Sequence, residues 1–150
     1  MKRHEALAPL SREHHDALLL AQLLKKDAPN YKGLPTDNLG KVEYTIQLFN
    51  TKLKHHFAVE DKLLAVAKHY HESIAQLTIE IKQEHEQLIK MITDLPKSKQ
   101  LEVDLDLLGN FLKQHVRKEE RDLLRGSKKA HKALDKAARK RSEGPGTKNT

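Results

Sequence analysis

Apolar residues recur at spacings of three and four along most of the chain, in four segments separated by polar or helix-breaking stretches. This spacing places the apolar side chains on one face of an α-helix. No stretch alternates strictly enough between apolar and polar residues to predict a strand. The pattern predicts four amphipathic helices, at about residues 11 to 27, 36 to 70, 73 to 95 and 98 to 125.

Residues that favour helix starts and stops lie at the breaks. Pro96 ends the third helix, because proline cannot continue the hydrogen-bonding ladder. Short connections between helices that each need to bury one face predict an antiparallel, up-down four-helix bundle, of the all-α class. The expected N-caps are Ser11, then Thr36 or Asp37, then Ser73 with Gln76 as a capping box, and finally Ser98 or Asp104.

The positive charge gathers at the C-terminal end of the chain. The 150 residues carry a net charge of +7, and residues 126–150 hold eight basic and two acidic side chains, so that segment supplies most of the excess. The run from residue 142 is polar and rich in Gly and Pro, a composition typical of disorder. We therefore expect one bundle domain over residues 1–126 and a basic, partly disordered extension over residues 127–150.

The amino-acid composition excludes several classes of function. The chain has no cysteine, which excludes disulfides, thiolate metal sites, iron–sulfur clusters and cysteine nucleophiles. No apolar run is long enough to span a bilayer, and the N-terminus lacks the apolar core of a secretory signal, so we expect no membrane association and a cytoplasmic location. The ten histidines, against six aromatic residues, point to His, Asp and Glu as the candidate metal ligands.

Two of the predicted helices carry the same pattern, a His followed four residues later by a Glu. The pairs are His56 with Glu60 and His115 with Glu119. Residues at this spacing are offset by about 40° around the helix and about 6 Å along it, so both side chains project from one face. The other two helices each place one His on the apolar stripe, namely His14 and His85. One or two candidate ligands therefore face the core from every helix.

Buried imidazoles and carboxylates need either mutual hydrogen bonds or a cation. A single histidine of this kind is more often a hydrogen-bonded core residue or a surface residue than a metal ligand. The repetition of such histidines on all four helices favours metal ligation. Imidazole and carboxylate ligands without sulfur suit Fe, Mn or Zn, and the two glutamates, Glu60 and Glu119, favour a dinuclear site that they bridge.

The four segments LSREHHDALLLA, HHFAVEDKLL, IKQEHEQLIKMI and LKQHVRKEERDLL resemble those of the hemerythrin-like, or HHE cation-binding, family. The resemblance covers roughly residues 10–125 and implies a non-haem di-iron centre in a four-helix bundle. It leaves His15 open as an alternative to its neighbour His14, and His55 stands in the same relation to His56. The iron ligands that it implies are His14, His56, Glu60, His85, His115 and Glu119.

Two departures from the family pattern bear on function. Oxygen-carrying hemerythrins have a fifth His one turn before the third-helix ligand, where this chain has Ile81. Their last carboxylate lies at the position of Glu120, whereas the wider HHE group uses that of Glu119. The resemblance thus implies two Fe ions with an open coordination position that react with O2, peroxide or nitric oxide, in sensing, storage or a stress response. It leaves open whether the protein is an enzyme.

The main alternative is a metal-free helical module that binds nucleic acid or a protein partner through the basic extension. Lysine and arginine side chains there could neutralise phosphates, and such binding would weaken steeply with salt. No aromatic residue interleaves the basic run, so a solvated tail is the expected role. The sequence does not fix the oligomeric state.

Overall fold

The computed structural model describes residues 8–124 together with residues 132, 136, 137 and 139. The described residues are helical apart from the connections and contain no strand. The α-helices are α1 (Ala8–Leu23), α2 (Asn38–Leu48), α3 (Lys54–Ala67), α4 (Glu72–Asp94) and α5 (Leu101–Glu119). The short segments are the π-helices η2 (Phe49–Leu53) and η4 (Glu120–Leu124) and the 3-10 helix η3 (Leu95–Lys97).

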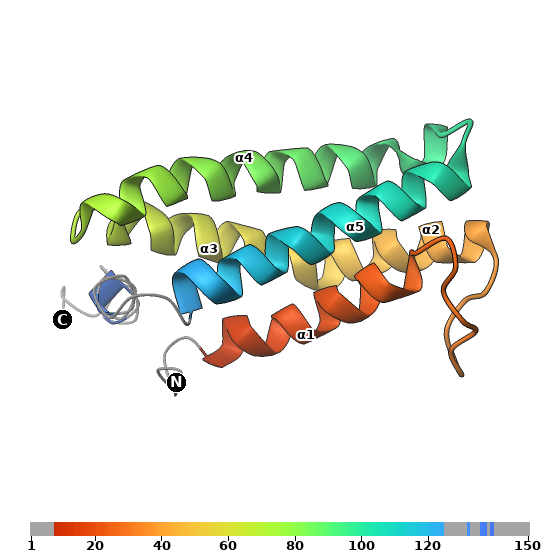
Figure 1. Cartoon of the computed structure of the whole chain (residues 1–150), viewed down its shortest axis with the longest axis horizontal. Helices are drawn as coiled ribbons and strands as arrows, with labels where there is room; N and C mark the ends of the chain where they lie inside the picture. Colours follow the sequence, from red (N-terminus) through yellow and green to blue (C-terminus); the bar gives the residue numbers. More distant parts are fainter. Residues whose placement is uncertain (1–7, 125–131, 133–135, 138, 140–150) are drawn as a thin grey trace, which may run out of the picture.

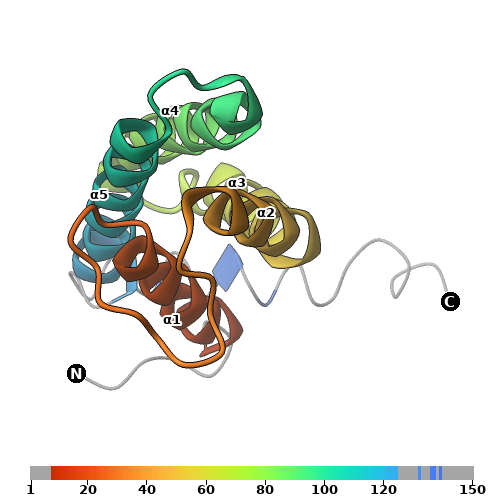
Figure 2. The same ribbon diagram turned by 90° about the vertical axis from the view of Figure 1, so that its right-hand side faces the viewer.

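The helices form a four-helix bundle in which α2, η2 and α3 follow one another as a single rod (Figure 1). The connections from α1 to α2 and from α4 to α5 lie at one end of the bundle, and the connection from α3 to α4 lies at the other. Seen along the bundle, the four rods surround a common interior (Figure 2). The all-helical class predicted from the apolar pattern is confirmed.

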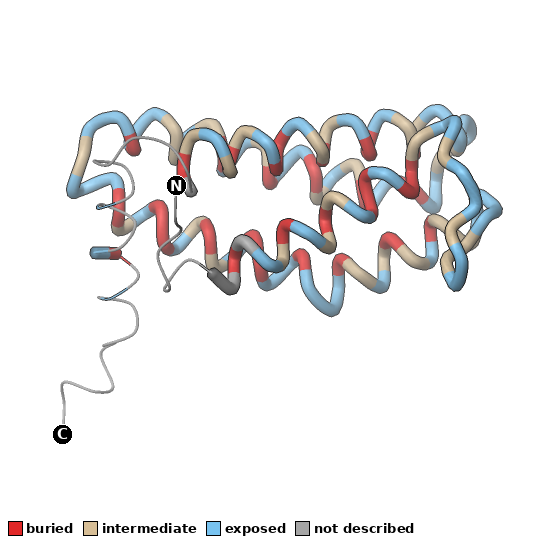
Figure 3. Tube along the Cα trace, turned by 60° about the horizontal axis from the view of Figure 1, so that its bottom comes forward, coloured by how far each residue is buried: buried red, intermediate tan, exposed pale blue. Residues whose placement is uncertain are grey.

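Buried positions recur along the inward side of every helix, and exposed positions lie outward (Figure 3). The buried side chains form two separate apolar clusters. The first includes Ala17, Leu53, Leu88 and Leu112. The second is smaller and is built from Leu10, Leu63, Leu64, Ala67, Ile74, Ile81, Leu123 and Ala137.

Of the N-caps predicted for the second and third helices, the first is confirmed and the second is wrong. Asp37 is the N-cap of α2, and its side chain accepts a hydrogen bond from the backbone N–H of Gly40. The capping box predicted at Ser73 is wrong, because the chain is already helical at Glu72. The N-cap of α4 is His71, whose Nδ1 accepts from the backbone N–H of Ser73 at 3.1 Å.

The predicted caps of the first and fourth helices are also wrong. The first helix is already formed at Ala8, so Ser11 lies inside it. The last helix follows Gln100, whose side chain makes no capping hydrogen bond. The Ser98 hydroxyl instead accepts from the backbone N–H of Gln100 and donates to Asp104. The two candidate caps therefore bond to each other: Ser98 lies just before α5, and Asp104 lies in its first turn.

Little of the basic extension belongs to the described residues. Lys132, Lys136, Ala137 and Arg139 are helical, and Ala137 is buried in the second apolar cluster. Lys136 Nζ lies 5.6 Å from the ring centroid of Tyr70. The rest of the extension predicted over residues 127–150 lies outside the described residues. In the part of the chain that is described, no helix has the length and apolar character needed to cross a membrane.

Candidate metal centre

A layer of buried polar side chains separates the two apolar clusters. On α1, Leu10 belongs to the second cluster and Ala17 to the first, and His14 lies between them in the sequence. On α4, His85 likewise lies between Ile81 of the second cluster and Leu88 of the first. On the other two rods, the second cluster is reached only after the Glu, at Leu63 and Leu123. Water has little access to this layer, because each of its side chains belongs to a residue at most 4% exposed. The layer consists of His14, His56, Glu60, His85, His115 and Glu119.

A π-helical segment adjoins each of the two His-x-x-x-Glu pairs. The segment η2 ends at Leu53, three residues before His56, and η4 begins at Glu120, directly after Glu119. Hydrogen bonds of the i to i+5 type change the rotational phase of a helix, and such segments are frequent at functional sites. Neither segment was predicted from the sequence, because the apolar pattern was interpreted with an uninterrupted period of 3.6 residues. Because η2 precedes His56, it shifts the phase of that pair relative to α2, whereas η4 shifts the phase of the residues that follow Glu119.

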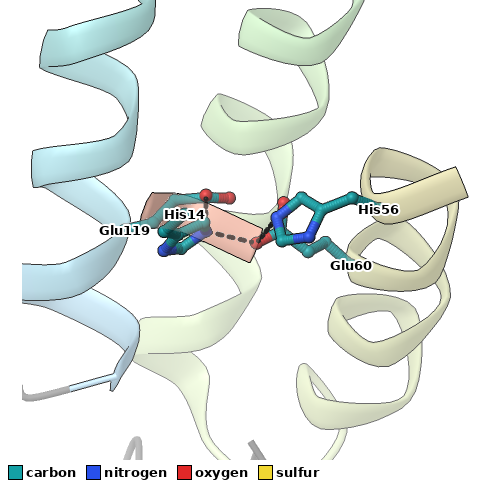
Figure 4. Close-up of side chains that lie close together, drawn as sticks. All are labelled: His14, His56, Glu60 and Glu119. Carbon is teal, nitrogen blue, oxygen red and sulfur yellow. Dashed lines mark hydrogen bonds and ion pairs between the residues drawn. The ribbon is translucent and has the colours of Figure 1, made fainter. Parts of the chain in front are cut away.

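Glu60 contacts imidazoles from three rods. Its Oε2 lies 3.1 Å from Nε2 of His14 on α1 and 3.1 Å from Nε2 of His56 on its own helix. Its Oε1 lies 3.0 Å from Nε2 of His85 on α4. Figure 4 shows His14 and His56 on either side of the Glu60 carboxylate. The two oxygens of one carboxylate thus face different histidines.

Glu119 makes a matching set of contacts from α5. Its Oε1 lies 2.9 Å from Nε2 of His14 and 3.3 Å from Nε2 of His115, and its Oε2 lies 3.6 Å from Nε2 of His85. The His14 contact is visible in Figure 4. Each carboxylate therefore contacts at least one imidazole of the pair His14 and His56 and at least one of the pair His85 and His115. Bridging ligands of a dinuclear site make contacts of this kind.

The buried donor atoms form two groups that could each hold a metal ion. One group is His14, His56, Glu60 and Glu119, and the other is Glu60, His85, His115 and Glu119; within each group the donor atoms lie within 4.8 Å of one another. The two histidine pairs have the same arrangement, with ring centroids 4.9 Å apart and planes at 64°. Because both glutamates belong to both groups, the arrangement suits two cations that share two carboxylates.

Several atoms that point into the layer lie close to an oppositely charged group without forming a hydrogen bond. A buried polar atom without a partner costs about 1–3 kcal/mol, and divalent cations bind such imidazole nitrogens and carboxylate oxygens. The chemistry of this donor set therefore fits a pair of metal ions. The atoms without a hydrogen bond among the described residues include Nε2 of His56, His85 and His115, Oε1 of Glu60 and both carboxylate oxygens of Glu119.

A second set of carboxylates, which we call the outer carboxylates, contacts the far side of the imidazoles. A carboxylate only accepts hydrogen bonds, so the Nδ1 that faces it carries a proton, and Nε2 is the nitrogen that can give up its proton and bind a cation. Three imidazoles donate from Nδ1 in this way: His56 to Glu13 at 2.9 Å, His85 to Asp61 at 2.8 Å and His115 to Glu84 at 2.6 Å. For His14, the corresponding distance to Oε1 of Glu120 is 3.7 Å.

The outer carboxylates were not predicted from the sequence, although the sequence contains a signal for them. Each one is the immediate neighbour in the sequence of a residue in the buried layer, and it acts on the histidine of the next helix. Adjacent residues on a helix are about 100° apart, so an acid beside an inward-facing residue points toward the neighbouring helix. The neighbours are Glu13 with His14, Asp61 with Glu60, Glu84 with His85, and Glu120 with Glu119.

The carboxylates hold protons on the imidazoles when no cation competes. Burial alone would lower the pKa of His14, but its contacts with the carboxylates of Glu119, Glu120 and Glu60 raise it to about 12. Burial likewise opposes the charged forms of His85 and His115, yet nearby carboxylates raise their pKa to about 11 and about 9. Protons and metal ions therefore compete for the same nitrogens.

Glu119 stays ionised despite complete burial. Burial and the nearby charge of Glu60 both raise its pKa, but contacts with His115 and His14 outweigh them and lower it to about 2. The carboxylate of Glu119 is therefore available over the ordinary pH range, either to a protonated imidazole or to a cation that replaces the proton.

The structure brings together six of the seven residues predicted as ligands. His15 is exposed and belongs to neither group, whereas His14 is buried in the first of them. The same contrast holds for His55, which is exposed, and His56, which is buried. In both His-His pairs, the residue on the apolar stripe is the one that faces the layer.

Comparison with known protein families matched residues 4–125 to the hemerythrin HHE cation binding domain. No match was found among curated proteins or among solved structures. The matched region includes all six residues of the buried layer.

Proposed function

This chain belongs to the hemerythrin HHE cation-binding family, and from that premise we propose that its buried layer holds two iron ions which react with O2, peroxide or nitric oxide. One observation carries the proposal most directly: Glu60 and Glu119 each contact imidazoles of both ligand groups in an interior with little access to water. The proposal includes the antiparallel direction of successive helices, which the positions of the connections at alternate ends support.

Each side chain of the layer has a defined role in this proposal. His14 and His56 would bind one ion, His85 and His115 the other, and Glu60 and Glu119 would bridge them. A ferrous pair supplies electrons to a bound small oxidant when a coordination position is open. Ile81, which is fully buried one turn before His85, has an aliphatic side chain and adds no ligand, so six side chains serve two ions.

The protein supplies a dry and closely packed surrounding for this chemistry. The apolar clusters on both sides of the layer exclude water, which strengthens electrostatic interactions and limits access to small molecules. We infer a role in binding, sensing or storage rather than in the conversion of an organic substrate. This inference rests on the burial of the layer.

Spectroscopy of reconstituted protein tests the proposed reactivity. The full chain is loaded with Fe(II) without oxygen and is then exposed in turn to O2, peroxide and nitric oxide. We expect a near-ultraviolet absorption that appears with an oxidant and disappears when a reductant is added, both in the natural chain and in His15→Ala. A loaded chain whose spectrum ignores all three reagents contradicts the proposed reactivity. A chain that takes up no metal but shifts DNA at low salt would instead favour the interaction module.

A further inference from the structure

The two halves of the buried layer repeat one pattern of residues. In α1 and α4, the buried His follows a Glu, and in the other two rods a His-x-x-x-Glu pair is followed by an acid. Each outer carboxylate acts on the next helix, so the contacts run in one direction around the bundle: from α1 to α3, from α3 to α4, from α4 to α5, and from η4, which follows α5, back to α1. We call the pair His14 and His56 the α1/α3 half, and the pair His85 and His115 the α4/α5 half.

The α4/α5 half is held firmly on its outer side. Asp61 lies 2.8 Å from Nδ1 of His85, and Glu84 lies 2.6 Å from Nδ1 of His115. Lys118 fixes Glu84 in turn through a contact of 2.9 Å. The ring of Phe57 stacks on His85, with centroids 4.4 Å apart and planes at 18°. Both imidazoles of this half are therefore restrained before any cation binds.

The α1/α3 half has weaker restraints. Glu13 lies 2.9 Å from Nδ1 of His56, and its side chain is one-third exposed, as is that of Asp61, so the difference between the halves lies in the restraint of His14. Nδ1 of His14 makes no hydrogen bond within the described residues, and Oε1 of Glu120 lies 3.7 Å away. The position that corresponds to Phe57 in the repeat is Val116, directly after His115, which is aliphatic and offers no ring to stack on an imidazole.

We propose that the two cation positions are unequal: the α4/α5 half takes up a divalent cation first and holds it more tightly than the α1/α3 half. This inference rests on the proposed function, in which the layer holds two cations. An imidazole that is already oriented loses less freedom on binding, and an Nδ1–H bonded to a carboxylate makes Nε2 a better ligand. Asp61 and Glu84 act as positioning residues, because they contact the histidines and not the cation.

Titration of the cation-free full chain with Co²⁺ tests the inequality, with bound metal measured by equilibrium dialysis and ligand geometry by visible absorption. We expect two binding steps with distinct affinities. Asp61→Asn and Glu84→Gln should weaken the tighter step by roughly 10- to 100-fold, whereas Glu13→Gln should weaken only the second step. Glu86→Gln alters an exposed acid two residues from Glu84 on the same helix and should change neither step.

Histidine variants assign each step to a half. His14→Ala should keep the tighter step and lose the weaker one, and His115→Ala should do the reverse. Asp61→Asn removes one contact of a partly exposed side chain, so it tests the proposal even if Glu84→Gln folds poorly, and thermal unfolding of each cation-free variant checks the fold. Two equal steps, or a Glu13→Gln effect on the tighter step, would overturn the inequality while metal binding stands. A chain that binds no Co²⁺ and no Fe²⁺ overturns the proposed function together with it.

Discussion

The carboxylate of Glu60 on α3 crosses the interior of the bundle and lies 3.0 Å from Nε2 of His85 on α4. Both residues are nearly inaccessible to water. Glu60 also contacts the imidazoles of His14 and His56, and His85 also contacts the carboxylate of Glu119. A buried contact of this kind fixes the height of one helix relative to the next. It also places a carboxylate oxygen and an imidazole nitrogen where one cation can bind both.

Loss of either bridging carboxylate should remove bound metal. Glu60→Ala and Glu119→Ala each delete a side chain that belongs to both ligand groups, so we expect the iron content to fall by at least one ion per chain. Metal analysis after reconstitution and gel filtration measures this. Glu86→Ala, on the exposed side of α4, is the control and should keep the natural content. Full stoichiometry in both Glu60→Ala and Glu119→Ala would remove these residues as ligands.

Adjacent histidines provide a second, closely matched comparison. His14→Ala and His56→Ala should each reduce the bound iron, because both imidazoles face the buried layer. His15→Ala and His55→Ala change the same residue type one position away, on the exposed side of the helix, and should leave the iron content unchanged. Metal analysis of the four variants decides the point. A loss of iron in His15→Ala as large as that in His14→Ala would argue against the assignment.

The pH dependence of stability should differ between the cation-free and the loaded protein. The pKa values of His14, His85 and His115 are raised from 6.5 to about 12, 11 and 9. A pKa raised in the folded state stabilises the fold fully below pH 6.5, and the stabilisation decreases as pH rises toward the folded-state value. Cation binding needs the deprotonated imidazoles, so its contribution grows over the same window.

Thermal unfolding between pH 6.5 and 9 measures both trends. The Tm of the cation-free chain should fall as pH rises, and the increase in Tm caused by added cation should become larger. A cation-free Tm that rises across this window would show that the buried imidazoles are not held in their protonated form by the carboxylates.

The close approach of α1 and α5 depends on a glycine. A Cβ at Gly109 would lie 2.8 Å from the backbone oxygen of Ala21 and 3.1 Å from Cβ of Leu24. Alanine favours a helix by about 1 kcal/mol over glycine, but overpacking costs about 1–3 kcal/mol. We therefore expect Gly109→Ala to lower the free energy of unfolding by roughly 1 kcal/mol. Urea denaturation should show no such loss for the exposed neighbour Asn110→Ala; a stabilised Gly109→Ala would mean that the helices separate easily.

The inner residues of the site were predictable because they lie on the apolar stripes. His14 and His85 interrupt runs of apolar residues at helical spacing, and the stripe also distinguished His14 from His15. Outer carboxylates such as Asp61 and Glu84 were not predictable in this way. They lie one residue off the stripe, where acidic residues are common on exposed helix faces, and only the positions of the neighbouring helices show that they contact histidines.

In the fold, too, some features were predictable from the sequence and others were not. Periodicity predicted four helical rods, because burial of an apolar face dominates helix packing. It did not predict η2 and η4, since a π-helical segment has no strong local sequence signal and depends on how the helix packs against its neighbours. His71 was not foreseen as an N-cap because the usual capping residues are Ser, Thr, Asp and Asn. Here the imidazole Nδ1 accepts the hydrogen bond that a hydroxyl or carboxylate ordinarily accepts.

The number of iron ions bound per chain tests the central claim most directly. The full chain is reconstituted with excess Fe(II) without oxygen, separated from free metal, and analysed for iron and protein. The account predicts two ions per chain, because six buried side chains form two groups that share both carboxylates. A chain that retains no iron, or one that still binds two ions after Glu60 and Glu119 are both replaced by alanine, would contradict it.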